Sequence, residues 1–324
     1  MEYRSLGASG LRVSTVSLGS WLTYGRTVDD DQTAACLTRA YEAGVNFFDT
    51  ANVYAAGAAE IALGRWIKGV PRSDLVIGTK AFFPMGEGPN DCGLSRKHLV
   101  EQCHASLNRL GLDYVDLYQC HRYDESVPLD ETLRALDDLI SQGKVLYAGV
   151  SEWTAGQLSD AVAIQDRLGF RRLISNQPQY SLLARRIEDE VLPLSIREGI
   201  GQVVWSPLAG GVLTGKYLPG QAPPAGSRGA DPDSNMFMQR TLRDDVLDAV
   251  IRLRDRIAEP LGVSVAELAL AWALNTEGVT SVIVGASRPE QVNRNVAAAR
   301  ISLDAETIRR VEEIMAPFAT VAQH

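Results

Sequence analysis

Short strand-like runs and longer helical segments alternate along almost the whole chain. Apolar and β-branched runs predict eight strands, at residues 16–18, 46–49, 75–79, 115–120, 145–150, 173–176, 202–205 and 281–284. Between them, apolar residues recur at helical spacing and predict helices at 31–43, 58–68, 95–110, 129–141, 154–168, 187–197, 241–258, 265–274 and 288–298. Strict alternation of strand and helix requires parallel strands that are joined by crossover helices.

This order predicts an α/β fold, a (β/α)8 TIM barrel, in a single domain that spans residues 1–324. Such a barrel takes about 250 residues. The remainder predicts an N-terminal β-hairpin over 3–13 that closes the far end of the barrel, an extra helix after the seventh strand and a C-terminal helix at 305–315. A doubly wound sheet is the alternative, but neither GxGxxG nor GxxxxGK[ST] occurs in the sequence.

Two Gly- and Pro-rich segments, at 82–93 and 210–235, are longer than the other connections. They follow the third and the seventh predicted strands, at the C-terminal face where barrel enzymes build their sites. We therefore interpret both as binding loops or lids.

Charge and composition exclude several classes of protein. The 324 residues carry 32 Lys and Arg against 40 Asp and Glu, a formal net charge of −8, with no basic run. A nucleic-acid partner or an anionic-membrane partner is therefore not expected. The start MEYRSLGASG is charged where a signal peptide needs an apolar run, and the longest nearly apolar stretch, 268–274, is too short to span a membrane. The four cysteines form no CxxC pair and no metal-ligand spacing. We expect a reduced cytoplasmic protein without a bound metal.

Polar side chains follow three successive predicted strands. Asp49 and Tyr54 follow the second strand, Lys80 the third and His121 the fourth. A barrel brings successive strand ends to one central place. There, Tyr54 would protonate a carbonyl oxygen, Lys80 would lower the pKa of the phenol, Asp49 would orient Lys80, and His121 would donate a hydrogen bond to the same oxygen. Each residue alone is also consistent with a structural role, and their joint placement favours catalysis.

Seven segments, in order, resemble the aldo-keto reductases, and most of all the branch that includes the potassium-channel β subunits and their bacterial relatives. They are FFDTANVYAAGAAEIALG, VIGTK, GLSRKHLVEQCHASLNRLGLDYVDLYQCHRYD, YAGVSEW, SNQPQYSLL, VWSPLAGGVLTGKY and GASRPEQVNRNV. The resemblance implies that Asp49, Tyr54, Lys80 and His121 are the catalytic tetrad, with Tyr54 as the general acid.

The resemblance also implies a nicotinamide dinucleotide that lies across the barrel mouth. Ser151, Asn176 and Gln177 would hold the carboxamide, and Trp205 would stack on the nicotinamide ring. The pyrophosphate would contact the loop with Ser206, Pro207, Leu208, Gly210, Lys216 and Arg228. Ser20, Trp21, Thr27 and Asp49 match further cofactor- or substrate-facing positions.

The adenosine end of the cofactor would contact Gly285, Ser287, Arg288, Gln291 and Asn295. A hydroxyl, a guanidinium and a helix start suit a 2′-phosphate, so NADPH is favoured over NADH. An N-cap serine that is followed by surface charges is the structural alternative.

Three positions differ from the channel branch. His121 stands where channel β subunits tend to carry Asn, which favours turnover. Glu152 stands where that branch has a basic residue, and Arg294 where it has an acid.

The leading hypothesis is NADPH-dependent reduction of an aldehyde or ketone. The alternative is an NADP(H)-binding redox sensor or regulatory subunit with little turnover. A cofactor-free isomerase or lyase would leave Trp205 and the eighth-strand motif unexplained.

The substrate is expected to be a small carbonyl compound, in a pocket that Trp21, Tyr24, Trp153 and the 82–93 loop enclose. Aromatic walls suit flat or apolar carbonyls and also stack on sugars, so they do not choose between the two. Relatives in this branch form tetramers or larger rings, so a homo-oligomer is also expected.

Overall fold

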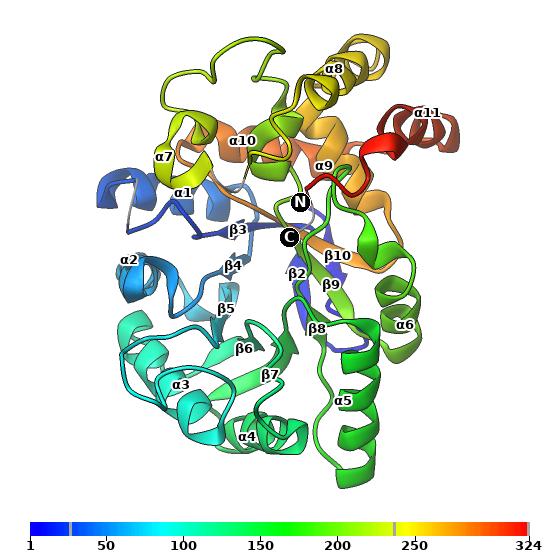
Figure 1. Ribbon diagram of the computed structural model, residues 1–324. Helices are drawn as coiled ribbons and strands as arrows, with labels where there is room; N and C mark the ends of the chain where they lie inside the picture. Colours follow the sequence, from blue (N-terminus) through cyan, green and yellow to red (C-terminus); the bar gives the residue numbers. More distant parts are fainter. Residues whose placement is uncertain (26–27, 236–237, 323–324) are drawn as a thin grey trace.

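Eight parallel strands form a closed barrel in the computed structural model, which describes residues 1–25, 28–235 and 238–322 (Figure 1). The strands are β3 (Val16–Gly19), β4 (Phe47–Asp49), β5 (Val76–Ala81), β6 (Val115–Cys120), β7 (Val145–Val150), β8 (Ser175–Asn176), β9 (Gly201–Trp205) and β10 (Val279–Val284). Neighbours in sequence are neighbours in the sheet, and β10 pairs with both β9 and β3, which closes the ring. The predicted (β/α)8 barrel is confirmed.

Helices surround this ring (Figure 1). They are α1 (Asp30–Glu42), α2 (Ala58–Ile67), α3 (Arg96–Leu110), α4 (Leu129–Ser141), α5 (Ala155–Leu168), α6 (Val191–Glu198), α7 (Pro232–Asn235), α8 (Asp244–Leu253), α9 (Val265–Asn275), α10 (Pro289–Ala297) and α11 (Ala305–Met315). The helices α5 and α9 begin with capping boxes, in which Thr154 pairs with Gln157 and Ser264 with Glu267. Among the described residues, no helix has the length and apolar character that crossing a membrane requires.

Three predicted segments differ from the structure by more than two residues. The helix predicted at 241–258 is α8 (Asp244–Leu253), followed by a π-helical turn at Arg254–Ala258. The helix predicted at 187–197 begins only at Val191, after a separate 3-10 turn at Arg186–Glu188. A continuous helix would place Pro193 in its interior, where the ring clashes with the carbonyl of Asp189, whereas the observed start places Pro193 in the first turn. The loop predicted at 210–235 contains the short helix α7 and two 3-10 turns, Ala209–Thr214 and Arg228–Ala230.

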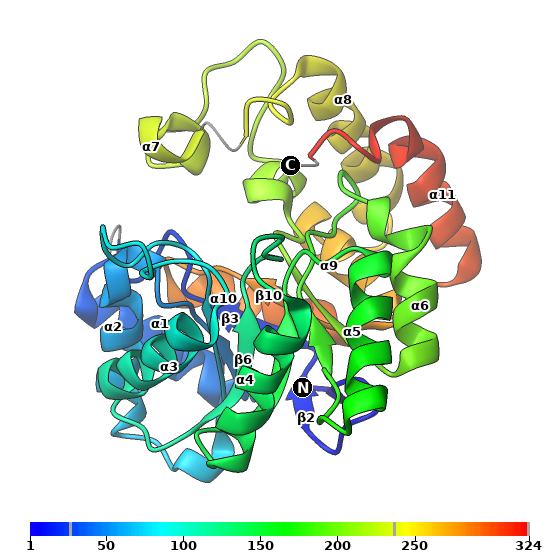
Figure 2. The ribbon, with the colours of Figure 1, turned by 60° about the horizontal axis from the view of Figure 1, so that its bottom comes forward.

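An antiparallel hairpin of β1 (Tyr3–Ser5) and β2 (Arg12–Ser14) covers one end of the barrel. Its buried Leu6 and Val13 belong to the same cluster as inward side chains of the strands, including Phe47, Leu117 and Val203. Figure 2 shows the hairpin at the opposite end of the barrel from the segment that carries α7. The barrel therefore has an apolar, closed end, and the site has to lie at the other.

Candidate active site

The pleat of the strands aims one polar side chain after another into the open end of the barrel. Side chains of a strand alternate between its two faces, so residues two apart share a face. On β5, Val76 belongs to the interior cluster with the hairpin, and Lys80 lies four residues further along the same face. On β6, Leu117 lies in that cluster, and His121 lies four residues further, just after the strand. The alternation that fills the closed end with apolar groups therefore brings Lys80 and His121 to the open end.

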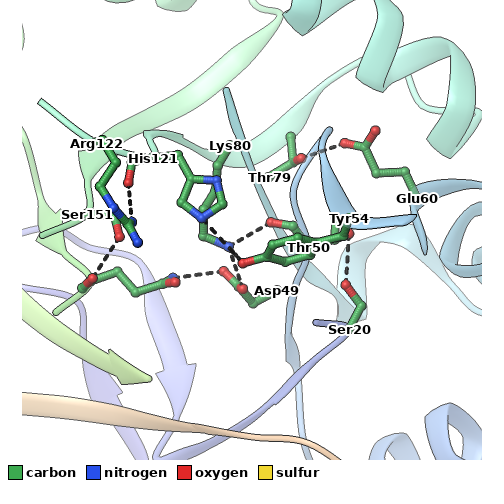
Figure 3. Close-up of polar contacts among 11 residues, drawn as sticks. Ser20, Asp49, Thr50, Tyr54, Glu60, Thr79, Lys80, His121, Arg122 and Ser151 are labelled. Atoms are coloured by element: carbon green, nitrogen blue, oxygen red, sulfur yellow. Dashed lines mark hydrogen bonds and ion pairs between the residues drawn. The ribbon is translucent and has the colours of Figure 1, made fainter. Parts of the chain in front are cut away.

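Lys80 lies at the centre of the site and each of its three N–H groups has an acceptor (Figure 3). Its Nζ donates to Asp49 Oδ2 at 2.6 Å, to the carbonyl oxygen of Thr50 at 2.8 Å and to Tyr54 Oη at 3.4 Å. Lys80 is 0% exposed and Asp49 3%. Gln177 Nε2 donates to the second oxygen of Asp49 at 2.8 Å. The buried charges are thus paired and held in one arrangement.

Tyr54 and His121 complete this set, which we call the catalytic floor (Asp49, Tyr54, Lys80 and His121). The Tyr54 Oη lies 3.5 Å from His121 Nε2, and the two rings meet edge to face. Tyr54 begins a 3-10 turn, Tyr54–Gly57, in which Ala55 and Ala56 have φ of +49° and +51°. Left-handed backbone costs a non-glycine residue about 1 kcal/mol. Such strain clusters at functional sites, and here it directly follows Tyr54.

Burial decides the protonation of the floor. It raises the pKa of Tyr54 more than Lys80 lowers it, so Lys80 acts in the expected direction while the net pKa is raised. For Lys80, burial alone would lower the pKa, but Asp49 and Tyr54 outweigh it and the pKa is raised. For His121, burial, Lys80 and Arg122 together hold the pKa well below its usual range. At neutral pH, Tyr54 is therefore a phenol, Lys80 an ammonium and His121 a neutral imidazole.

A second buried pair supports the segment between Tyr54 and Lys80. Glu60 on α2 is fully buried and accepts a hydrogen bond from Thr79 Oγ1 at 2.5 Å (Figure 3). It is also paired with Arg109 Nε at 2.6 Å. Thr79 is the neighbour of Lys80 on β5. The hydrogen bond from Thr79 ties the helix after Tyr54 to the strand that carries Lys80, and the ion pair ties that helix to α3.

A cleft of about 1250 Å³ extends from the floor to the start of α10. Most of the predicted cofactor residues line it, namely Trp21, Asp49, Ser151, Gln177, Trp205, Ser206, Pro207, Leu208, Gly210, Lys216, Arg228, Gly285, Ser287, Arg288, Gln291 and Asn295. Ser20 and Asn176 do not. Ser20 is buried and donates to Thr50 Oγ1, and Asn176 is buried and donates to Gln202 Oε1. Thr27 lies outside the described residues.

Four cations line the cleft beyond the floor, and we call them the cleft cations: Lys216, Arg228, Arg288 and Arg294. In the described parts of the chain, no carboxylate lies within 4.0 Å of any of them. Burial lowers the pKa of Arg228, whose guanidinium carbon lies 5.9 Å from the Trp21 ring. Asp231 opposes this lowering only at longer range, and a partly buried cation without a paired carboxylate is costly. The cleft is therefore complementary to an anionic ligand, although the chain as a whole is acidic.

The side chain of Glu152 fixes Trp205. The Trp205 indole Nε1 donates to Glu152 Oε1 at 2.8 Å, and the backbone N–H of Gln179 donates to the same oxygen at 2.6 Å. Arg186 is paired with the other oxygen at 2.5 Å. An indole N–H is a donor only, so a basic residue at 152 would leave it without this acceptor. Glu152 thus holds the indole of Trp205 through a defined contact.

Backbone strain also marks the segment that follows β9. Ser206 and Ala209 have φ of +54° and +48°, and Gly210 and Gly211 have φ of +67° and +102°. Glycine adopts such angles freely, while the two other residues are strained there. The N–H of Gly210 donates to Ser206 Oγ. The strained turn lies on the wall of the cleft, directly after Trp205.

The expected aromatic lining is confirmed in part. Trp21 and Tyr24 line the cleft, and Phe83 does so from the 82–93 loop. Trp153 does not, because it is 2% exposed and packs edge to face on Tyr123 outside the cleft.

Several lining residues were not predicted, among them Arg122, Gly211, Thr214, Ser227 and Ser264. Arg122 directly follows His121 in the segment QCHRYD. Its position just after a predicted strand end was the feature of the sequence from which its place in the cleft could have been predicted. Asp124, two residues further on, suggests an ion pair in the sequence that the structure does not contain.

Comparison with known proteins gives one family. Residues 15–316 match the sequence model of the aldo/keto reductase family. A probable voltage-gated potassium channel subunit beta from Arabidopsis thaliana is 48% identical over 301 residues, which cover 92% of this chain and 91% of its own. One from Oryza sativa subsp. japonica is 45% identical over 320 residues, 97% of each chain. A putative one from Schizosaccharomyces pombe is 44% identical over 324 residues, 97% of this chain and 93% of its own.

Proposed function

Because the chain belongs to the aldo/keto reductase family, we propose that it reduces an aldehyde or ketone to the alcohol with NADPH as cofactor. The observation that carries this proposal is the convergence of Asp49, Lys80, Tyr54 and His121 at the floor of the cleft. A carbonyl oxygen that gains negative charge needs a proton donor and a nearby cation, and the floor contains both.

Tyr54 is the proton donor of the reaction. NADPH, when bound, supplies the hydride that the carbonyl carbon accepts. The Tyr54 Oη gives its proton to the carbonyl oxygen, and Lys80 Nζ, 3.4 Å away, stabilises the phenolate that is left. Asp49 holds Lys80 charged and in place through the 2.6 Å contact. The raised pKa of Tyr54 keeps the phenol protonated over the physiological range.

His121 orients the carbonyl through Nε2–H. Its Nδ1 is buried and has no partner among the described residues. A buried N–H without an acceptor is rarer in proteins than an unfilled acceptor, so the proton belongs on Nε2. With Nε2 3.5 Å from Tyr54 Oη, both donors address the same oxygen.

The described residues fit a nicotinamide dinucleotide. Gln177 uses its Nε2 on Asp49, which leaves its Oε1 as an acceptor for a carboxamide N–H. Trp205, held by Glu152, offers a ring face for stacking. Lys216 and Arg228 suit the pyrophosphate, and Ser287 with Arg288 suits the 2′-phosphate that distinguishes NADPH.

Replacement of Tyr54 tests the reductase proposal. We expect Tyr54→Phe to lower kcat on a panel of aldehydes by at least about 100-fold, because the acid is lost. Quenching of Trp fluorescence by NADPH should be unchanged. Tyr123→Phe is the matched control, since it removes a hydroxyl near the site from a ring that packs on Trp153 outside the cleft. Retained turnover in Tyr54→Phe would refute the role of Tyr54.

The names of the relatives favour a second candidate function. Three relatives that are 44–48% identical are described as potassium channel beta subunits. This chain would then be a regulatory subunit that senses the oxidation state of bound NADP(H), with little turnover. Pull-downs with NADPH-loaded and NADP-loaded protein should recover different partners; identical partners, together with aldehyde turnover, would reject this candidate. The homo-oligomeric state and the cytoplasmic location remain predictions.

A further inference from the structure

Arg122 is a cation on the wall of the cleft, next to the catalytic floor. It follows His121 directly after β6, is half-buried, and lines the cleft together with Tyr54, His121 and Phe83. The cleft cations belong to the part of the wall formed by the loop after β9 and by α10, whereas Arg122 belongs to the part around the reacting oxygen.

Two contacts hold the guanidinium in place. The Nη1 of Arg122 donates to the carbonyl oxygen of His121 at 2.6 Å (Figure 3), and the guanidinium carbon lies 5.4 Å from the centre of the Phe83 ring. The remaining N–H groups have no hydrogen-bond partner among the residues that the structure describes. One side of the Arg122 guanidinium is therefore held in place, and its other N–H groups can donate to a ligand.

The acids that could neutralise Arg122 have other partners. Asp124 accepts hydrogen bonds from the N–H groups of Leu94 and Ser126, at 2.8 Å and 3.0 Å. Glu152 is paired with Arg186. Over the described ranges, no carboxylate lies within 4.0 Å of Arg122, while Asp49 and Lys80 neutralise each other. The substrate end of the cleft therefore carries one net positive charge.

This charge acts on the reacting groups. Arg122 lowers the pKa of Tyr54 and, after burial and Lys80, that of His121. Arg122 also follows His121 directly and lines the same cleft as both donors, so a small molecule whose carbonyl they hold can reach the guanidinium with another of its groups.

We propose that the substrate is a carbonyl compound that carries a negatively charged group, a carboxylate or a phosphate, and that Arg122 binds this group. The inference rests on the proposed reductase function and narrows its substrate class. A guanidinium fork matches the geometry of both anions, and the bond between two charged groups is stronger than one between neutral groups. The anion holds the substrate while Tyr54 and His121 hold its carbonyl.

Matched substrate pairs test the proposal. We would compare kcat/KM for 4-carboxybenzaldehyde with its neutral methyl ester, and for glyceraldehyde 3-phosphate with glyceraldehyde. We expect wild type to prefer at least one charged member by about 10- to 100-fold. The first pair reports on a carboxylate and the second on a phosphate. Arg122→Met should abolish the preference, and Arg122→Lys should retain part of it.

Arg134→Met is the matched control variant. Arg134 packs on the Phe170 ring at 5.1 Å in the same way, but it does not line the cleft. It should leave the preference unchanged. Arg122→Met should leave NADPH binding intact and lower kcat/KM far more for the charged members than for the neutral ones, because its effect on Tyr54 and His121 is the same for both members of a pair.

The outcomes separate this inference from the function it rests on. Turnover of neutral aldehydes without a charge preference would overturn the role of Arg122 and leave the reductase intact. Equal losses for charged and neutral substrates in Arg122→Met would show a structural role and overturn it too. If no aldehyde turns over, the reductase proposal fails; equal affinity of NADP-loaded wild type for 4-carboxybenzyl alcohol and its methyl ester would then reject the anion site as well.

Discussion

The catalytic floor and the cleft cations are two charged regions of one cleft, and they are built in opposite ways. On the floor, Lys80 has an acceptor for each of its three N–H groups, and the paired Asp49 is 3% exposed. Along the rest of the cleft, Arg228 and Arg288 have no carboxylate within 4.0 Å among the described residues. The charged groups of the floor are therefore paired within the protein, whereas Arg228 and Arg288 have no paired carboxylate among the described residues.

The difference separates two tasks. A proton donor works best when its surroundings are fixed before the substrate arrives. A site for an anion gains affinity when its cations have no competing partner in the free protein. Changes on the floor should therefore affect stability and turnover together, while changes among the cleft cations should affect ligand affinity alone.

Removal of Lys80 should have the largest effect. In Lys80→Met, Asp49 becomes a buried carboxylate without its cation, which costs about 3–5 kcal/mol of unfolding free energy. Turnover should fall by at least about 100-fold, because the phenolate of Tyr54 loses its counter-charge. Urea denaturation and aldehyde reduction measure the two effects.

The double variant Asp49→Asn with Lys80→Met sharpens this test. It removes both charges, so stability should recover relative to Lys80→Met while turnover stays low. A double variant no more stable than the single one would contradict the view of the floor as a closed ion pair.

Loss of a cleft cation should have an intermediate effect that is confined to affinity. We expect Arg288→Gln to weaken NADPH binding by about 10- to 100-fold, since a hydrogen bond to a charged group is worth about 1.5–3 kcal/mol. NADH, which lacks the 2′-phosphate, should bind as before. Titration of Trp fluorescence measures both, and Arg300→Gln, an exposed arginine outside the cleft, is the control. If Arg288→Gln weakened the binding of NADPH and NADH equally, Arg288 would not be the residue that binds the 2′-phosphate.

The smallest expected effect is a pH dependence of stability. The folded protein holds the pKa of His121 well below that of the unfolded chain, near 6.5. Below pH 6.5 the unfolded chain therefore binds a proton that the folded protein does not. The free energy of unfolding falls as pH falls, by at most about 1.4 kcal/mol per pH unit for this group. His121→Asn should reduce that slope in urea denaturation between pH 6.5 and 5, and an unchanged slope would contradict it.

The barrel could be predicted from the sequence because its signals are local. The bounds of β6, β7, α4 and α11 match the predicted ranges, since each has a clear period and a clear end. The strand ends also allowed Asp49, Lys80 and His121 to be expected in one place, and the contacts of Lys80 with Asp49 and of Tyr54 with both Lys80 and His121 confirm this. The catalytic roles stay predictions.

Burial and orientation could not be predicted in the same way. The pKa of Tyr54 depends on how completely the surrounding elements exclude water, which outweighs the neighbouring Lys80. Trp153 and Trp21 look equivalent in sequence, yet only Trp21 lines the cleft. Arg122 was not predicted, because the sequence does not show which way its side chain turns or that the nearby Asp124 accepts the N–H of Leu94.

The hairpin that covers the closed end has a consequence for synthesis of the chain. Ser281 Oγ donates to the carbonyl oxygen of Ser14, and Arg4 Nη1 donates to those of Leu274 and Val279. These bonds join residues 267 to 275 positions apart. On the ribosome, the first residues to emerge therefore wait for almost the last before they gain these partners. Contacts of such long range form slowly, so Leu6 and Val13 remain available to chaperones for most of translation.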